Sequence, residues 1–195
     1  LDRQNYAQDL QIQSRGFGAR STFGIRGIKL VVDGIPSSAA DGQKPAGTFA
    51  HGALERIEVL RGPLALHYGN AAGGAIIART ALPADRGFDV EAWAGSDDAH
   101  RIAMAANGAS ADDAWRWNAH GNRFSTDGER PHSAALRSQF NAVVQWSPRA
   151  GQHLRIVANG LSQPSTQDPL GITRTLWQRE PQGTDPAATQ FDTRK

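Results

Sequence analysis

The side chains that most often carry catalysis or bind metals are present in this sequence, but their spacing matches no catalytic or metal-binding motif. The six histidines include no pair four residues apart and no His-Glu-x-x-His sequence, so a zinc hydrolase has no support. No serine stands in a Gly-x-Ser-x-Gly elbow, and Asp9, Asp33 and Asp41 lack the spacing of a calcium loop. We therefore expect no catalytic residues, no resident metal, no cofactor and no enzymatic activity.

Glycines at positions 16, 18, 24 and 27 form a cluster of the kind found in nucleotide-binding loops. Gly16-x-Gly18 is followed by Ser21 where the dinucleotide fingerprint requires Gly or Ala, and the chain has no Gly-Lys-Ser/Thr sequence. The cluster therefore indicates a steric role, because glycine permits tight turns and close approach of two backbones.

Composition limits the classes of protein to which the chain can belong. It has 195 residues, of which 39% are hydrophobic and 21% are charged, so we expect a folded protein. The 21 glycines and 10 prolines favour an all-β or α+β fold, and the lack of cysteine excludes disulfides and thiolate metal sites. A net charge of +2 with scattered arginines argues against a nucleic-acid partner.

After residue 87 the sequence alternates apolar and polar residues with a period of two, which indicates strands between two different environments. Residues 115–122 and 136–146 show the pattern clearly, and residues 154–159 show it with one lapse at Val157. Each run approaches the roughly 9–11 residues that a tilted strand needs to cross a bilayer. No run of about 18 apolar residues occurs, so a transmembrane helix is excluded.

These apolar faces fit either a membrane barrel or the core of a soluble sandwich, and periodicity alone does not separate the two. Three further features favour the barrel. Tryptophans stand at or near the run ends, where the outer aromatic girdles of a membrane barrel lie at the lipid headgroups. Connections alternate between short and long. The polar faces carry amides and arginines suited to a wet lumen, so we expect the apolar side chains of 136–146 to point outward and the polar ones inward. The tryptophans are Trp93, Trp115, Trp117 and Trp146; the short connection is 147–151, and the long ones are 125–133 and 163–190.

Residues up to 83 follow a different pattern, in which short apolar runs alternate with glycines. Strands are expected at 28–32, 57–60 and 75–80, with Asp33-Gly34 as a turn and Pro63 as the first residue of a short helix. We therefore expect two domains. Residues 1–83 form an α+β domain with a small mixed sheet and short helices, and residues 84–195 form antiparallel β-barrel strands.

Two stretches of the first domain resemble the plug domain of TonB-dependent outer-membrane receptors. Residues 14–20, 23–28, 31–36 and 41–43 resemble the central plug motif, and residues 54–63, 68–70 and 73–77 resemble the closing motif. The resemblance implies the C-terminal part of a plug, followed by the first strands of an incomplete transmembrane β-barrel. The remaining strands and the TonB-binding segment are then expected outside this sequence.

The resemblance implies a receptor for active uptake, located as a multi-pass β-barrel in the outer membrane of Gram-negative cells. Its implied partners are TonB, a metal chelate and outer-membrane lipid. Residues 23–27 and 41–43 are similar to ferric-siderophore receptors, so a ferric siderophore is the expected cargo, while copper, cobalamin, haem and carbohydrate remain open. The rival interpretations are a passive porin-like channel and a soluble all-β carbohydrate-binding module.

The resemblance also implies residues for two sites. Arg15 and Arg61 match plug arginines that pair with barrel glutamates in the family, and Arg26 is a third candidate for plug–barrel contacts. Two plug loops are candidates to reach toward the ligand, and their candidate residues are Arg20, Phe23, Asp41 and Gln43.

Overall fold

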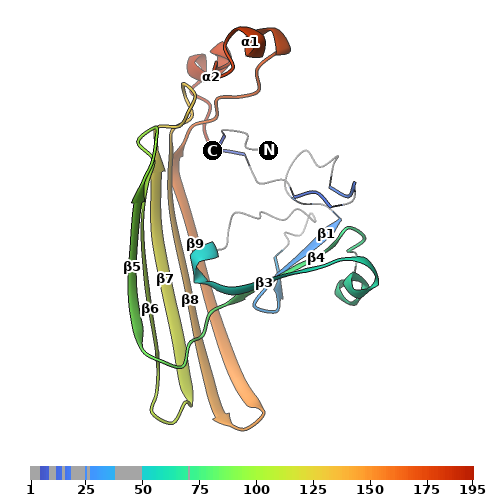
Figure 1. Cartoon of the computed structure of the whole chain (residues 1–195), viewed down its shortest axis with the longest axis vertical. Helices are drawn as coiled ribbons and strands as arrows, with labels where there is room; N and C mark the ends of the chain where they lie inside the picture. Colours follow the sequence, from blue (N-terminus) through green and yellow to red (C-terminus); the bar gives the residue numbers. More distant parts are fainter. Residues whose placement is uncertain are drawn as a thin grey trace.

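The computed structural model describes residues 5–8, 12–14, 16–18, 25, 27–37, 50–69 and 71–195. In this part of the chain the strands form a four-stranded sheet before residue 81 and a five-stranded sheet after residue 86 (Figure 1). We call them the small sheet and the wall. The predicted fold class, a small mixed sheet with short helices followed by antiparallel strands, is confirmed. The exact division into domains at residue 83 stays a prediction.

The small sheet is mixed and has the strand order β2-β1-β4-β3. β1 runs parallel to β4, whereas β2 and β3 pair antiparallel with their neighbours. β3 begins three residues before the predicted strand, and the short helix after it begins one residue before Pro63. The elements are β1 (Ile28–Val32), β2 (Ile35–Pro36), the 3-10 helix η1 (His51–Ala53), β3 (Leu54–Leu60), the 3-10 helix η2 (Gly62–Tyr68) and β4 (Gly74–Thr80).

The small sheet has its own apolar core, formed by one of its faces. Ile25, Ile28 and Leu30 are fully buried there, and four partly buried side chains pack against them: Ile12, Val32, Leu54 and Ile76. Burial of a side chain of this size contributes about 1.5–3 kcal/mol. The small sheet therefore does not depend on the wall for its core.

Glycine has a steric role at several turns of the first part of the chain. Gly16, Gly18 and Gly27 have φ values of +83°, +84° and +72°, so the turn role predicted for the glycine cluster is confirmed at these positions. At the start of β4, a Cβ atom on Gly74 would lie 2.7 Å from the carbonyl oxygen of Leu60. The pairing of β3 with β4 therefore requires glycine there.

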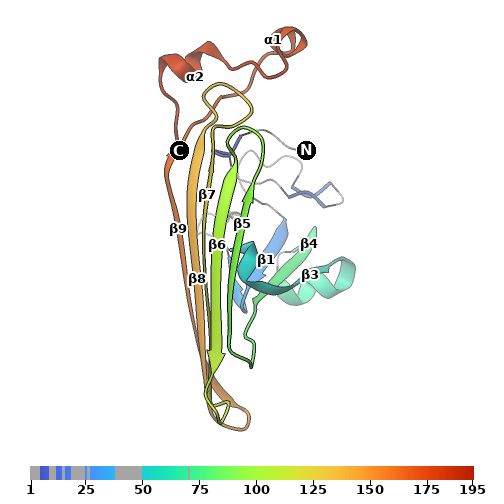
Figure 2. The ribbon, with the colours of Figure 1, turned by 60° about the vertical axis from the view of Figure 1, so that its left-hand side comes forward.

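The wall is an antiparallel meander in which each strand pairs with the next one in the chain (Figure 2). Short turns join β6 to β7 and β8 to β9 at one end. The other end carries the long connection after β9, which contains α1 and α2 (Figure 1). The elements are β5 (Gly87–Ala94), β6 (His100–Ala109), β7 (Trp115–Thr126), β8 (Ala135–Arg149), β9 (Gln152–Thr166), α1 (Arg174–Arg179) and α2 (Pro186–Gln190).

Two strands of the wall are longer than predicted. β8 continues through Pro148, so the turn that follows it is shorter than 147–151, and β9 continues to Thr166, so the long connection begins after residue 166 and not at 163. Both strands contain a proline near a register shift, Pro148 in β8 and Pro164 in β9. A bulge leaves one residue out of the hydrogen-bond ladder, which allows a strand to continue past a proline.

The two faces of the wall differ as the alternation predicts. On β8, Phe140 and Trp146 are 49% and 39% exposed, whereas Asn141 is 2% exposed. The apolar face is turned away from the small sheet, so the predicted orientation of residues 136–146 is confirmed. Among the described residues, every helix is too short or too polar to span a membrane.

Trp93 is an exception to the predicted arrangement of the tryptophans. It stands opposite Arg101 in the β5–β6 ladder, on the face that carries the Glu91–Arg101 ion pair, and its ring lies 6.1 Å from that of Phe124. The ring of Phe124 also lies 5.4 Å from that of Tyr6. Trp93 therefore belongs to the inner face, and its assignment to an outer aromatic girdle is wrong. Trp115 and Trp146 stack on the outer face with ring centroids 5.6 Å apart.

Candidate functional site

The candidate functional site is the contact between the small sheet and the polar face of the wall. In Figure 1 the small sheet lies on the side toward which the wall curves. The contacts involve β1, β4 and η1 on one side and β6, β7, β8 and β9 on the other. They are mostly polar, because the apolar core of the small sheet lies within that sheet.

The first contact is centred on Asp33, which directly follows β1. Because β1 and β4 are parallel, their carboxyl ends lie at the same edge of the sheet, and Asp33 reaches Thr80 at the end of β4. Its Oδ1 accepts a hydrogen bond from the Thr80 backbone N–H at 2.9 Å, and its Oδ2 accepts one from the Thr80 hydroxyl at 2.6 Å. The Asp33 side chain is completely buried.

Arg155 of β9 brings the wall to this carboxylate. Its Nη1 lies 3.6 Å from Asp33 Oδ1, and its Nη2 donates to the carbonyl oxygen of Thr80 at 3.4 Å. The separations are longer than the 2.7–2.9 Å that is typical of a two-point guanidinium–carboxylate pair. Arg155 Nε is buried and has no hydrogen-bond partner among the described residues. The contact is therefore directional but not tightly closed.

This contact shows what the sequence analysis missed. The sequence predicts a turn at Asp33-Gly34, and φ values of +52° and +82° at these two residues confirm it. The carboxylate, however, is also the plug-side member of an ion pair with the wall. Arg155 stands on the polar face of its alternating run, which was a signal that it points inward. Its partner across the chain had no sequence signal.

A second contact places η1 against three strands of the wall. A Cβ atom on Gly52 would lie 2.6 Å from His120 Nε2 and 3.2 Å from an Arg101 nitrogen, so glycine permits the close approach. Next to it, the Ala81 backbone N–H donates to the Ala53 carbonyl oxygen at 2.8 Å, and Asn118 Nδ2 donates to the Ala81 carbonyl oxygen at 2.8 Å. These hydrogen bonds connect three segments: η1, the residue that follows β4, and strand β7 of the wall.

His51 lies at the same contact, and burial and neighbouring charges there shift its pKa. Partial burial lowers the pKa of His51, and the nearby Arg137 guanidinium of β8 lowers it further. The other charged or titratable groups at this contact are Arg101 and His120, with Glu91 paired to Arg101 at 2.9 Å. Cations outnumber carboxylates here, so a proton on His51 is unfavourable.

A third set of contacts lies at the end of the wall that carries α1 and α2. Asn5 Nδ2 donates to Asp168 Oδ1 at 2.7 Å, which links the start of the described chain to the long connection. Arg130 is 9% exposed and orders that connection by donating to three backbone carbonyls. The carbonyls belong to Gly183 at 2.9 Å, Leu170 at 3.1 Å and Pro169 at 3.4 Å.

Of the site residues expected from the sequence, Arg61 is the one that the structure describes. It is exposed, directly follows β3 and precedes Gly62, whose φ is +72°. No ion pair joins Arg61 to a carboxylate within the described ranges, so its pairing with the barrel stays a prediction. The others lie outside the described residues: Arg15, Arg20, Phe23, Arg26, Asp41 and Gln43.

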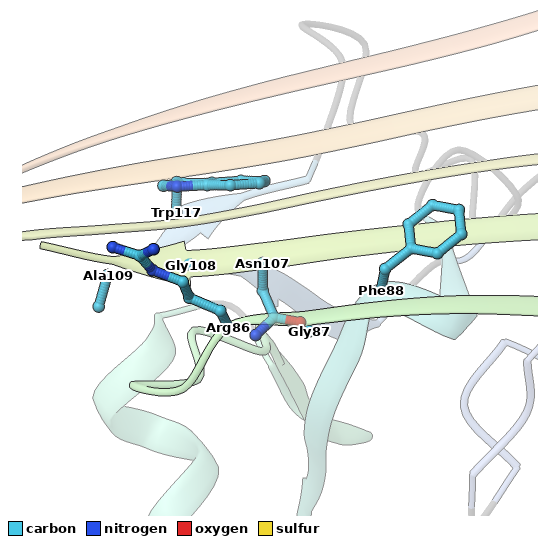
Figure 3. A pocket seen from close by; sticks show the side chains of 7 residues that line it. All are labelled: Arg86, Gly87, Phe88, Asn107, Gly108, Ala109 and Trp117. Atoms are coloured by element: carbon cyan, nitrogen blue, oxygen red, sulfur yellow. The ribbon is translucent and has the colours of Figure 1, made fainter.

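No metal centre competes with this interpretation. In the described part of the chain, no three His, Asp or Glu side chains come together as metal ligands. A hollow of about 540 Å³ near the start of β5 is lined by Phe88 and Trp117, both exposed, and by Arg86 (Figure 3). The indole of Trp117 lies against Gly108, where a Cβ atom would be 2.9 Å from its Nε1. This hollow does not involve the small sheet.

Comparison with known proteins agrees with the two-sheet arrangement. Residues 3–76 match the family described as the TonB-dependent Receptor Plug Domain. The first part of the chain, with most of the small sheet, is therefore similar to the plug of TonB-dependent receptors. The sequence of the chain is 35% identical over 101 residues to the vitamin B12 transporter BtuB of Vibrio vulnificus strain YJ016, a match that covers 48% of this chain and 16% of that protein.

Solved siderophore and pyoverdine receptors share the fold. The siderophore receptor PirA of Pseudomonas aeruginosa superimposes with a TM-score of 0.54 at 25% identity, over 80% of this chain and 28% of that one. The pyoverdine outer-membrane receptor FpvA of P. aeruginosa PAO1 gives a TM-score of 0.57 at 21% identity, over 67% of this chain and 20% of that one. The chain thus spans less than a third of the length of these relatives, and the small sheet corresponds to the plug and the wall to barrel strands.

We expect the Asp33–Arg155 contact to stabilise the docked plug. In the full-length receptor, Arg155→Gln leaves the buried Asp33 without its cation and should lower the opening free energy of β4 by about 1–3 kcal/mol. Hydrogen exchange of the β4 amides measures this quantity. Asp33→Asn should lower the opening free energy of β4 less in the Arg155→Gln background than in the wild type. If the effects of the two substitutions on this free energy were strictly additive, the pairing would be contradicted. Glu58→Gln, which breaks an exposed ion pair with Arg56, is the matched control.

We also expect acid to loosen the η1 contact. The folded-state pKa of His51 lies below its unfolded value near 6.5, so the unfolded state binds the proton more readily. Stability is then complete above about pH 6.5 and falls as pH drops from there through the folded pKa. The protection factors of residues 50–56, which correct for the intrinsic pH dependence of amide exchange, should fall as the pH drops below about 6.5, and His51→Gln should reduce that fall. An unchanged pH profile in His51→Gln would refute the assignment; the exposed His153 provides the control substitution.

Proposed function

We propose that the protein is a TonB-dependent receptor for active uptake across the outer membrane of Gram-negative cells, with a ferric siderophore as cargo. Outer loops capture the chelate, TonB in the periplasm pulls on the plug through an N-terminal segment, and the cargo passes inward. The ligand undergoes no covalent change, so the protein is not an enzyme. The remaining barrel strands and the lipid around them complete the receptor.

One observation carries this proposal: the plug is docked on the wall by polar contacts, while its apolar core is internal. Hydrogen bonds contribute about 0.5–1.5 kcal/mol each, and several of them hold the plug without the large cost of exposing a shared apolar core. Such an interface suits a plug that must remain closed at rest and rearrange under force. A passive channel needs no docked plug, and a soluble sugar-binding module would bury the apolar face of its wall.

The two faces of the wall support this proposed location. Its outer face exposes Phe88, Val90, Ile102, Met104 and Ile156, and its inner face carries arginines and amides. An apolar outside and a polar inside are the arrangement of an outer-membrane barrel. Lipid is therefore the proposed partner of the outer face.

Two cargo classes have support, and they differ in kind. Siderophore receptors are prominent among the structural relatives, which supports a ferric siderophore. The sequence relative named above is a vitamin B12 transporter, which makes a cobalamin the second candidate. The cargo is selected by loops and wall segments of the receptor. These segments extend beyond the residues that match the siderophore receptors and the vitamin B12 transporter.

Uptake assays on cells that express the full-length receptor test the proposal. We expect growth on a ferric siderophore as sole iron source, and we expect the growth to disappear when tonB is deleted. The same cells in a cobalamin-dependent growth assay test the second candidate. Uptake that continues without TonB would contradict active transport and favour a passive channel.

The plug arginines give a second expected outcome. We propose that Arg15, Arg26 and Arg61 pair with glutamates of the barrel, and that Arg20, Phe23, Asp41 and Gln43 belong to the loops that face the ligand. Arg61→Ala or Arg15→Ala should reduce uptake and leave chelate binding to whole cells nearly unchanged. The physical reason is that the barrel glutamate proposed as the partner would be left buried without its cation, which costs about 3–5 kcal/mol. Normal uptake in both single variants and the double variant would refute the role, and lost binding would move these arginines to the ligand site.

A further inference from the structure

A cavity of about 520 Å³ lies between the small sheet and the wall, beside the Asp33–Arg155 contact. Most of its lining comes from β1, β4, the turn after β1 and the end of η2, and Arg155 of β9 completes it. This volume lies within the range of roughly 300–1,000 Å³ that is typical of small-molecule sites. A molecule bound there would contact the plug and the barrel wall at the same time.

The charged groups around the cavity are mainly cationic. Lys29, Arg79 and Arg155 line it, together with His67 and Tyr68. Asp33 is the single carboxylate among the lining residues that the structure describes, and its oxygens already accept two hydrogen bonds from Thr80 and face Arg155. Lys29 and Arg79 therefore have no carboxylate within the lining to offset their charges, and the cavity is suited to an anion.

The spacing of these two cations limits the size of the anion. Lys29 stands opposite Ala75 in the β1–β4 ladder, and Arg79 is four residues further along β4. At about 3.3 Å per residue, their backbone positions differ by about 13 Å along the strand. An anion that contacts both side chains in extended conformations must therefore carry oxygens at separate points of its rim. A compact metal chelate with several anionic oxygens on its rim fits this spacing.

We propose that this cavity is a cargo subsite for a negatively charged metal chelate, with Lys29 and Arg79 binding anionic oxygens at its two ends. The inference rests on the proposed uptake function and narrows its cargo to anionic chelates, such as ferric tris-catecholates, in preference to neutral ferric trihydroxamates. Ammonium and guanidinium groups form charge-assisted hydrogen bonds with such oxygens. Arg155, which Asp33 holds in place, positions the wall side of the cavity.

Crystals of the full-length receptor, soaked with a ferric tris-catecholate, test the binding directly. We expect an iron anomalous peak in the cavity, and we expect it to be absent in Lys29→Gln/Arg79→Gln. Arg79→Lys, which keeps the charge, should retain the peak and serves as a check on folding. Arg56→Gln is the matched control, because Arg56 pairs with Arg79 in the β3–β4 ladder but is neutralised by Glu58 at 2.7 Å. A wild-type peak at the outer loops without one in the cavity would overturn the proposal.

Transport assays separate this inference from the proposed function. In cells, Lys29→Gln/Arg79→Gln should lower the maximal uptake rate of the ferric tris-catecholate about tenfold or more, while binding at the cell surface stays unchanged. Wild-type cells that import only the neutral ferric trihydroxamate would refute the subsite and leave the receptor function standing. Wild-type cells that import neither chelate would refute the siderophore function itself, whatever the crystals show.

Discussion

The structure depends on one constraint: the wall must offer a polar face to the plug and an apolar face to the other side. Strand alternation meets this constraint, since successive side chains point to opposite faces. On the inner face, Asn118, His120 and Arg155 contact the plug through hydrogen bonds, close packing and one ion pair. Because the plug keeps its apolar core to itself, the two sheets can separate without exposing a common core.

The ion pair at this interface has the opposite polarity from the one that the family resemblance implies. The resemblance places arginines on the plug and glutamates on the barrel, whereas here the carboxylate of Asp33 belongs to the plug and the guanidinium of Arg155 to the wall. Both polarities meet the same physical requirement, which is a directional bond that resists random motion but opens under force. The Asp33 side chain is fully buried, whereas the Arg155 side chain is 27% exposed and already contacts water. Separating the pair therefore leaves only one of the two charges, that of Asp33, both buried and unpaired.

Cations predominate at the plug–wall contacts. The same excess of positive charge explains the acid sensitivity expected at η1 and the anion proposed for the cavity. Arg101 and Arg137 flank η1, and Lys29 and Arg79 line the cavity. Around η1 the excess positive charge makes protonation of a histidine unfavourable, and in the cavity it favours an anion. The described plug–wall contacts are thus basic both around η1 and in the cavity, which favours anions at either place.

The sequence by itself determined the class of each sheet, because local patterns carry that information. The alternation along 136–146 set which residues of β8 face outward, and the glycine and proline positions set the turns around Asp33-Gly34 and Pro63. The plug motifs indicated the similarity to the plug family that residues 3–76 match. The pattern placed the ends of β8 and β9 too early, because both strands continue past prolines that stand at register shifts of the β8–β9 ladder. Only the tertiary structure decided which side chains meet across the two sheets. Asp33 and Arg155 are brought together by the parallel pairing of β1 with β4 and by the docking of that edge on β9, and no local pattern encodes a contact between residues so far apart in the chain.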